Sequence, residues 1–294
     1  MAVHADDSSR RYTQWAGIPP IGALTFPAAP ALCSVPGRTS PDSIRLVAVP
    51  QLSVVVPVYN GASRLPASLA ELRDFLAPDG DASELILVDD HSAPATAAIL
   101  ERFSAETPNV RLLRNERNSG KGFAVARGML AARGHHRVFT DADLAYPSTQ
   151  IARIVSKLEA GADVAVACRV LPESRYIMSP TFFSYLYTRH LMSRAFNRAV
   201  RWTLVPDVLD TQAGLKGFSA SAADLIFPRL KTTGFGFDVE VLHLARRRGL
   251  KIVQTPVEFR YDEEPTTVRF ASDALRMARD LARIRWSDWR GYYD

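Results

Sequence analysis

Cysteine and long apolar runs are both scarce in this chain of 294 residues. Its two cysteines, Cys33 and Cys168, stand far apart, so the sequence indicates neither a disulfide framework nor a zinc site. No stretch reaches the roughly 20 apolar residues that cross a bilayer as a helix, and prolines interrupt the apolar segment 17–36. We therefore expect no membrane-spanning helix, no secretory signal peptide and a reducing, cytoplasmic compartment.

A large excess of one charge is also absent, because 36 basic residues face 31 acidic ones and the formal net charge is +5. A surplus this small suits an anionic substrate or a membrane surface, and it suits an ordinary arginine-rich soluble protein equally well. We expect no nucleic-acid partner. Composition alone leaves the function open.

Apolar runs alternate with helical spacing after residue 48. We interpret 1–48, which is rich in Ala, Pro and Ser, as a disordered extension and 49–294 as one domain. The predicted strands are 52–59, 84–90, 110–114, 137–140, 163–168 and 251–259. The predicted helices are 65–76, 95–105, 122–132, 148–160, 238–247 and 270–285, and a glycine-containing loop covers 210–218. This alternation predicts an α/β fold with a Rossmann-like, mostly parallel sheet, whose ligands bind beyond the carboxyl ends of the strands.

Acidic residues stand at two of those strand ends. Asp141 and Asp143 follow one strand, and carboxylates at positions i and i+2 of an extended segment project to the same side. Both can therefore converge on one Mg²⁺ or Mn²⁺ ion that also binds substrate phosphates. Asp89 and Asp90 end another strand, where they could accept hydrogen bonds from a base or a ribose hydroxyl. The alternative for both pairs is a solvated turn with a helix cap.

The segment Asn118–Gly122 opens a predicted helix and contains two glycines and Lys121. Glycines allow close backbone approach, a helix N-terminus favours anions, and the lysine adds a point charge. The spacing of a Walker motif is missing. On its own the segment could equally be a plain glycine-rich turn.

Six segments follow one another along the chain: Val54–Asn60, Val88–Asp90, Asn115–Gly122, Asp141–Asp143, Asp210–Phe218 and Phe235–Glu240. In this order they resemble the motifs of inverting family 2 glycosyltransferases with the GT-A fold. The last two segments resemble the branch that glycosylates polyprenyl phosphates, especially dolichyl-phosphate β-glucosyltransferases. The resemblance covers about residues 50–285.

The resemblance implies a role for each matching residue. Residues that would bind the nucleotide and the diphosphate are Pro57, Tyr59, Asp89, Asp90 and Lys121. Asp141 would contact the donor, and Asp143 would bind the metal most directly. Gln212 and Lys216 would border the donor sugar and the acceptor phosphate. Asp238 would lie near the attacking group, with Glu240 a weaker candidate, and the acceptor phosphate would be bound by Arg169, Arg175 and Arg189.

The implied reaction is an inverting, metal-dependent transfer of a hexosyl group to a polyprenyl or dolichyl phosphate, with UDP-glucose favoured over GDP-mannose as donor. A soluble glycan or small metabolite is the alternative acceptor, and a non-catalytic nucleotide-sugar-binding protein is a further alternative. Asp238 would be the general base for a hydroxyl acceptor and a positioning group for a phosphate acceptor. Two features depart from the family pattern: Gly61 replaces the usual acidic residue, and the usual membrane anchors are absent.

Two segments mix aromatic and basic residues at helical spacing, 181–202 and 270–286. Such helices can lie in a membrane interface, which would allow peripheral contact at the cytoplasmic face. The alternative is a core-facing stripe with a solvated charged side. We expect Trp286 and Trp289 to be packing anchors.

Overall fold

The computed structural model describes residues 49–178, 197–198, 200–261 and 270–294. The predicted extension 1–48, most of the aromatic segment 181–202 and Arg189 lie outside these residues. Within them, no helix is long and apolar enough to cross a membrane.

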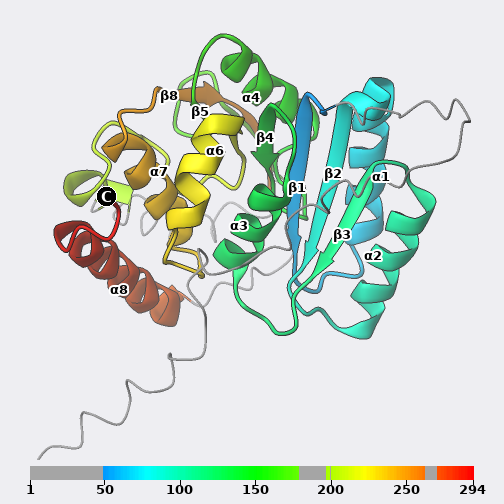
Figure 1. The fold of residues 1–294 in the computed structure, drawn as a ribbon, viewed down its shortest axis with the longest axis horizontal. Helices are drawn as coiled ribbons and strands as arrows, with labels where there is room; N and C mark the ends of the chain where they lie inside the picture. The colour runs from blue at the N-terminus through cyan, green and yellow to red at the C-terminus, as the bar shows by residue number, and fades with distance from the viewer. Residues whose placement is uncertain (1–48, 179–196, 199, 262–269) are drawn as a thin grey trace, which may run out of the picture.

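A seven-stranded sheet forms the centre of the molecule, with the strand order β3-β2-β1-β4-β7-β5-β8 (Figure 1). All neighbouring pairs are parallel except those of β7, which runs antiparallel to both β4 and β5. This mostly parallel sheet confirms the predicted α/β fold. Its strands are β1 Leu52–Val58, β2 Ser83–Asp89, β3 Val110–Arg114, β4 His136–Phe139, β5 Val164–Cys168, β7 Lys216–Ser219 and β8 Ile252–Pro256.

The central strands are buried on both faces, which explains their continuous apolar runs. In β1, six of the seven residues are buried and Pro57 is partly buried, as expected for a parallel strand covered by helices on both sides. The helices are α1 Leu65–Leu76, α2 Pro94–Glu106, α3 Lys121–Ala131, α4 Thr149–Glu159, α6 Ala220–Ile226, α7 Phe237–Arg247 and α8 Phe270–Trp289. Two short 3₁₀ helices are η4 Ala77–Ala82 and η6 Phe227–Arg229.

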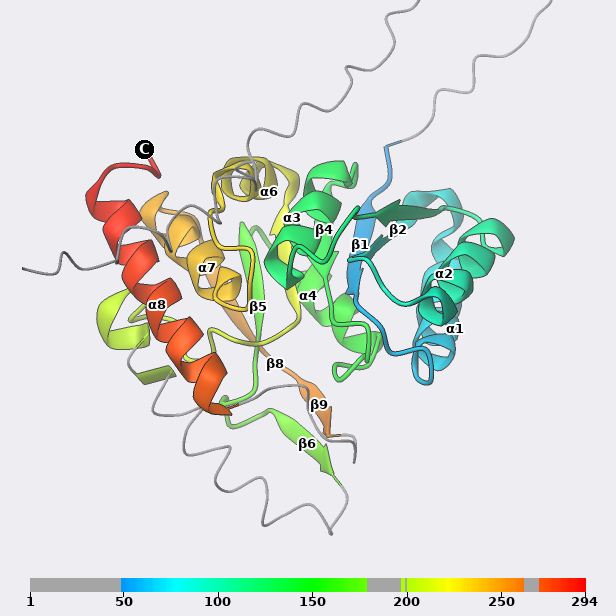
Figure 2. The ribbon, with the colours of Figure 1, turned by 90° about the horizontal axis from the view of Figure 1, so that it is seen from below.

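Two hydrophobic clusters lie on opposite faces of the sheet. Alternate residues of β1 divide between them: Val55 belongs to the cluster with residues of α3, α6 and α7, whereas Val54 and Val56 belong to the cluster with residues of α1 and α4. Helix α3 approaches β1 closely, because a Cβ atom at Gly128 would lie 2.3 Å from Val55 Cγ1. Helix α8 runs alongside α7, on the side of the molecule away from α1 and α2 (Figure 2).

The structure corrects two element predictions in the second half. The loop expected at 210–218 ends in strand β7, which inserts antiparallel in the centre of the sheet. The single strand expected at 251–259 is two strands, β8 and β9 (Glu258–Tyr261), and β9 pairs with β6 (Arg175–Met178) in a separate two-stranded sheet. Pro256 ends β8 because proline has no N–H group to continue a ladder.

The prediction that Trp286 and Trp289 are packing anchors is wrong. Their exposed fractions are 48% and 78%, and the Arg290 guanidinium stacks 5.2 and 5.6 Å from their ring centroids. Helix α8 instead buries Ile284 and Ser287, which lie about one turn apart on a different face. The tryptophans are therefore surface residues.

Candidate functional site

The register of β7 brings two distant segments together at the carboxyl end of β4. Phe139 at the end of β4 pairs with Lys216 at the start of β7. Because the strands are antiparallel, the loop that precedes Lys216 lies beside the loop that follows Phe139. The 210–215 segment and the predicted metal-binding carboxylates therefore meet at one edge of the sheet.

Gly214 packs directly against the carboxylate of Asp141. A Cβ atom at position 214 would lie 1.9 Å from Asp141 Oδ2 and 2.7 Å from its Cγ. A side chain would need the carboxylate to move. The observed position of Asp141 thus favours glycine at position 214.

Lys121 and Asp141 form an ion pair at this edge. Lys121 is the first residue of α3, and its Nζ lies 2.5 Å from Asp141 Oδ1. Burial disfavours the charge of Lys121, but Asp141, Asp238 and Asp143 attract it, so the pKa of Lys121 is raised above its ordinary value. The ammonium group therefore stays charged next to the predicted metal ligands.

A second ion pair, Lys216 with Asp238, lies inside the protein. Lys216 Nζ is 2.5 Å from Asp238 Oδ1 and donates a 2.6 Å hydrogen bond to the Ala213 carbonyl. The Lys216 side chain is fully buried, and burial lowers its pKa despite the attraction of Asp238. Asp238, in the first turn of α7, is therefore held by a buried lysine rather than free in solvent.

Asp143 lies at the rim of the site, next to Asp141. Its side chain reaches solvent, and its Oδ1 accepts a 3.1 Å hydrogen bond from the Ala145 N–H. The surrounding protein and the like charge of Asp141 raise the pKa of Asp143. A divalent cation between the two carboxylates would relieve this repulsion, so the residues fit such an ion. No group of three or more His, Cys, Asp or Glu in the described part of the chain could hold a metal ion, so further ligands would come from substrate oxygens or water.

Asp90 shapes the loop that leads into α3. Its carboxylate accepts hydrogen bonds from Asn115 Nδ2 at 2.7 Å and from the backbone N–H groups of Ser119 and Gly120, both at 2.8 Å. Gly120 has φ +96° and abuts the Thr233 carbonyl, 2.5 Å from where a Cβ would lie. Asp90 thereby fixes the backbone immediately before Lys121.

Asp89 is fully buried at the end of β2. Its Oδ1 accepts a 2.8 Å hydrogen bond from the Ser92 N–H, and its Oδ2 pairs with Arg114 Nε at 3.0 Å. Pro57 and Tyr59, which were also predicted to bind the nucleotide, lie at the carboxyl end of β1 and differ in exposure. Pro57 is partly buried, whereas Tyr59 is 57% exposed.

Three buried polar atoms near these residues have no hydrogen-bond partner among the described atoms: Gln212 Nε2, Thr140 Oγ1 and Tyr146 Oη. Buried polar groups are normally hydrogen-bonded, so unpaired ones at a site are candidates for ligand contact. Burial raises the pKa of Tyr146 well above its ordinary value, and the charges of Asp210 and Asp141 add to the effect. The sequence analysis missed Thr140 and Tyr146. The position of Thr140 directly before Asp141 was an available signal, whereas Tyr146 looks like any core aromatic residue.

Arg169 pairs with Asp210 in a two-pronged contact. The Nε–Oδ2 distance is 2.7 Å and the Nη2–Oδ1 distance is 2.9 Å. Burial opposes the charge of Asp210, but Arg169 outweighs it and lowers the pKa of Asp210. Arg175, the other described arginine expected to bind the acceptor, is exposed at the start of β6 in the smaller sheet. Among the described residues, Arg175 forms no hydrogen bond or ion pair with the lysine–aspartate pairs.

Glu240, the weaker acidic candidate, is fully buried with internal partners. Its carboxylate accepts hydrogen bonds from the backbone N–H groups of Lys231 and Thr232 at 2.9 and 2.7 Å, and from Tyr293 Oη at 2.5 Å. These contacts join α7 to the preceding loop and to the C-terminal residues. Glu240 thus has a structural function in this fold.

Comparison with known proteins gives consistent similarities. Residues 53–216 match the family described as glycosyl transferase family 2. The chain is 33% identical over 245 residues to the dolichyl-phosphate beta-glucosyltransferase of Dictyostelium discoideum, covering 80% of this chain and 74% of that protein.

Solved structures share the fold. Glucosyl-3-phosphoglycerate synthase from Mycobacterium tuberculosis in complex with UDP has a TM-score of 0.60 at 21% identity, with 80% of each chain covered. The same enzyme in complex with Mn²⁺, UDP-glucose and phosphoglyceric acid has a TM-score of 0.57 at 20% identity, covering 81% of this chain and 79% of that one.

Proposed function

Since this chain belongs to glycosyl transferase family 2 and is a glycosyltransferase, we propose that it transfers glucose from UDP-glucose to a polyprenyl phosphate. The name of the Dictyostelium relative supports the sugar and the acceptor class. The observation that carries the proposal is the meeting of the Lys121–Asp141 and Lys216–Asp238 pairs at the carboxyl edge of the sheet. GDP-mannose is the second donor to be tested.

The donor diphosphate would bind where α3 begins. Asp143 and Asp141 would hold a Mg²⁺ or Mn²⁺ ion, which would offset the charge that the departing diphosphate gains. Lys121 and the N-terminus of α3 add fixed positive potential on the same side. Gly120 carries no side chain, so the backbone can approach the phosphates closely.

The acceptor half of the reaction would need little base catalysis. A phosphate oxygen is already anionic at neutral pH, so it can attack the anomeric carbon directly and invert an α-linked donor to a β-linked product. Asp238 would then orient Lys216 and set the charge of the site, consistent with their 2.5 Å contact. Gln212 Nε2, buried without a partner among the described atoms, would donate to the sugar or to the acceptor phosphate.

A lipid acceptor also requires contact with a membrane. We propose peripheral binding to the cytoplasmic face, supported by the exposed rings of Trp286 and Trp289 and the Arg290 guanidinium stacked on both. Aromatic rings and arginine are the side chains that favour a membrane interface.

The test is a transfer assay with radiolabelled UDP-glucose or GDP-mannose and polyprenyl phosphate in detergent, with Mn²⁺ or with EDTA. We expect a β-glucosyl phosphoryl polyprenol from UDP-glucose, and no product with EDTA or in Asp143→Ala. Turnover of a water-soluble glycan or metabolite without lipid product would contradict the polyprenyl-phosphate acceptor and indicate a soluble one. Tight donor binding without any transfer would favour a non-catalytic binding protein.

A further inference from the structure

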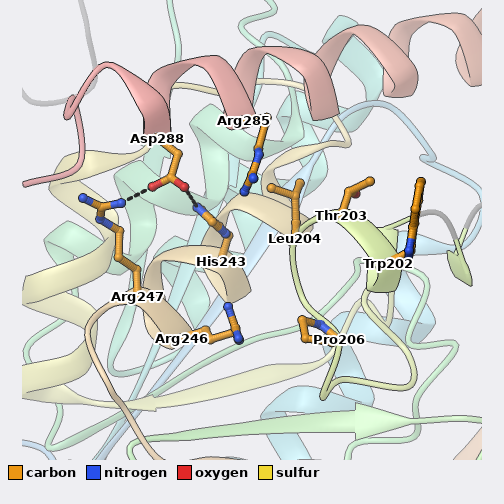
Figure 3. A pocket seen from close by; sticks show the side chains of 9 residues that line it. All are labelled: Trp202, Thr203, Leu204, Pro206, His243, Arg246, Arg247, Arg285 and Asp288. Carbon is orange, nitrogen blue, oxygen red and sulfur yellow. Dashed lines mark hydrogen bonds and ion pairs between the residues drawn. The ribbon is translucent and has the colours of Figure 1, made fainter.

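A cavity of about 360 Å³ lies between the C-terminal ends of α7 and α8 and the segment 202–206 (Figure 3). Its α7 residues are His243, Arg246 and Arg247, about two turns along the helix from Asp238. Eight residues of helix from Asp238 to Arg246 span about 12 Å. The cavity is therefore separate from the candidate donor site.

Positive charge exceeds negative charge on the cavity wall. Arg246 pairs with Asp207 at 3.4 Å, and Arg247 pairs with Asp288 and Asp294. Both arginines lie in the last turn of α7, where they also offset the negative end of the helix dipole. These two side chains therefore have structural reasons for their positions.

For Arg285, no comparable ion pair among the described residues explains the position of the side chain. It descends from α8 into the cavity, toward His243 and Leu204 (Figure 3). No ion pair or hydrogen bond joins Arg285 to another residue in the part of the chain that the structure describes. A guanidinium group that lines a cavity and is not paired with a carboxylate is a ready partner for an anion.

The His243 ring also lines the cavity, and its nitrogen atoms lack hydrogen-bond partners among the described atoms. Its side chain is only 7% exposed, and its Nε2 lies 3.4 Å from Asp288 Oδ2 without meeting hydrogen-bond geometry. Its Nδ1 has no partner among the described atoms. Because buried ring nitrogens are normally hydrogen-bonded, the His243 ring that lines the cavity is a candidate for contact with a ligand. The Asp288 carboxylate is held by Arg247, which offsets its repulsion of an anion.

The opposite wall is apolar. Trp202, which is 89% exposed, Leu204 and Pro206 line it (Figure 3). An exposed tryptophan at the mouth of a basic cavity can cover a flat or apolar part of a ligand whose anionic end binds the arginine. A ligand that contacts both walls therefore carries an anionic group and an apolar portion.

We propose that this cavity binds a phosphate ester that carries an apolar or aromatic portion. Arg285 binds the phosphate oxygens through its forked N–H groups, His243 hydrogen-bonds to the same group, and Trp202 covers the apolar portion. A soluble phosphorylated metabolite and a phospholipid headgroup share this chemistry. The site does not depend on the donor or acceptor proposed above.

The experiment uses the full chain without nucleotide sugar. Phenyl phosphate is titrated by calorimetry, and vesicles of phosphatidylcholine with or without phosphatidic acid are tested by flotation. Arg285→Gln should weaken phosphate binding about tenfold or more, because a charge-assisted contact is lost. Arg285→Lys should retain part of it, and Arg102→Gln, which removes an exposed charge from α2, should bind as wild type does.

The two arms identify the source of the phosphate. Arg285-dependent binding of phenyl phosphate alone supports a soluble ligand, and Arg285-dependent flotation with phosphatidic acid alone supports a lipid headgroup. The proposal is overturned if both probes bind wild type and Arg285→Gln equally, or if neither binds. The comparison of Arg285 with Arg285→Gln is repeated in the Asp143→Ala background. Any phosphate bound at the donor site is unaffected by Arg285, so a difference between the two variants reports on the cavity.

Discussion

At Gly214, the space between the backbone and the Asp141 carboxylate admits a hydrogen atom but not a methyl group. Asp141 in turn contacts Lys121, so its position determines where the lysine lies. A displacement of about 1 Å among such groups can lower catalysis by about 100-fold. A side chain at position 214 would displace the Asp141 carboxylate, so Gly214 is a sensitive probe of the site.

Gly214→Ala should lower kcat/KM at least about 100-fold, while costing about 1–3 kcal/mol of unfolding free energy through overpacking. Steady-state kinetics and urea denaturation measure the two effects. Gly234→Ala is the matched control, because a Cβ at Gly234 meets nothing within 4 Å. Near-wild-type turnover in Gly214→Ala would contradict the assignment of Asp141 to the site.

The Lys216–Asp238 pair gives a second prediction. Asp238→Ala leaves the fully buried Lys216 without its carboxylate, and such a change costs about 3–5 kcal/mol of unfolding free energy. The double variant Asp238→Leu/Lys216→Met leaves no buried charge and should recover most of that loss, while its transferase activity stays absent. Chemical denaturation compares the two.

The exposed ion pair Arg73–Asp74 serves as the control for these two variants. Its side chains are 51% and 68% exposed, so Asp74→Ala should change stability by less than about 1 kcal/mol. Equal destabilisation in Asp238→Ala and in the double variant would mean that the charge of Lys216 is not the cause.

At the scale of the elements, Glu84 joins three strands and the end of α3. Its carboxylate accepts hydrogen bonds from Ser53 Oγ on β1 and the Arg133 N–H, both at 2.7 Å, and pairs with Arg111 on β3 at 3.3 Å. Burial raises the pKa of Glu84, but these partners outweigh it, so the pKa is lowered below its ordinary value of 4.5. The folded state therefore favours the ionised form.

The pH dependence follows from this lowered pKa. The stabilisation by Glu84 is fully present above the unfolded-state value of 4.5 and is lost as the pH falls through the lower folded-state value. Glu84→Gln should be less stable than wild type at neutral pH, and the difference should shrink below pH 4.5. Thermal unfolding across this range measures it, with the exposed Glu106→Gln as control. A difference that stays constant with pH would contradict the account.

The elements also indicate which parts of the structure a sequence can predict. The strand β1 and the helix α1 follow directly from apolar periodicity, because each buries a contiguous set of side chains. Strand β7 does not, because it places a charged residue and a glycine in the centre of a sheet. The charge of Lys216 is balanced there by Asp238, 22 residues later in the chain. No local pattern reports such a pairing.

The same distinction applies to the candidate site. Asp141 and Lys121 could be grouped in advance, because the carboxyl ends of parallel strands share one edge. The packing of Gly214 on Asp141 could not be predicted, because it depends on the antiparallel register of β7. The surface position of Trp286 and Trp289 could not be predicted either, since their spacing on α8 does not reveal which face the rest of the protein covers.

At the scale of the whole molecule, one sheet separates two hydrophobic clusters and brings the charged pairs to a single edge. Helix α7 connects this edge to the basic cavity near its other end, through Asp238 at its start and Arg246 near its end. The C-terminal residues fasten α7 through the hydrogen bond of Tyr293 to Glu240. Helix α7 thus contributes residues to both proposed ligand sites.

The central claim is that Asp141 and Asp143 bind a divalent cation together with the donor diphosphate. Its most direct test is calorimetric titration of UDP-glucose into wild-type protein with Mn²⁺, into wild-type protein with EDTA, and into Asp143→Ala with Mn²⁺. The account predicts binding with Mn²⁺ that weakens at least about tenfold both in EDTA and in the variant, because a carboxylate–metal–phosphate contact is lost in each. Equal affinity under all three conditions would contradict it.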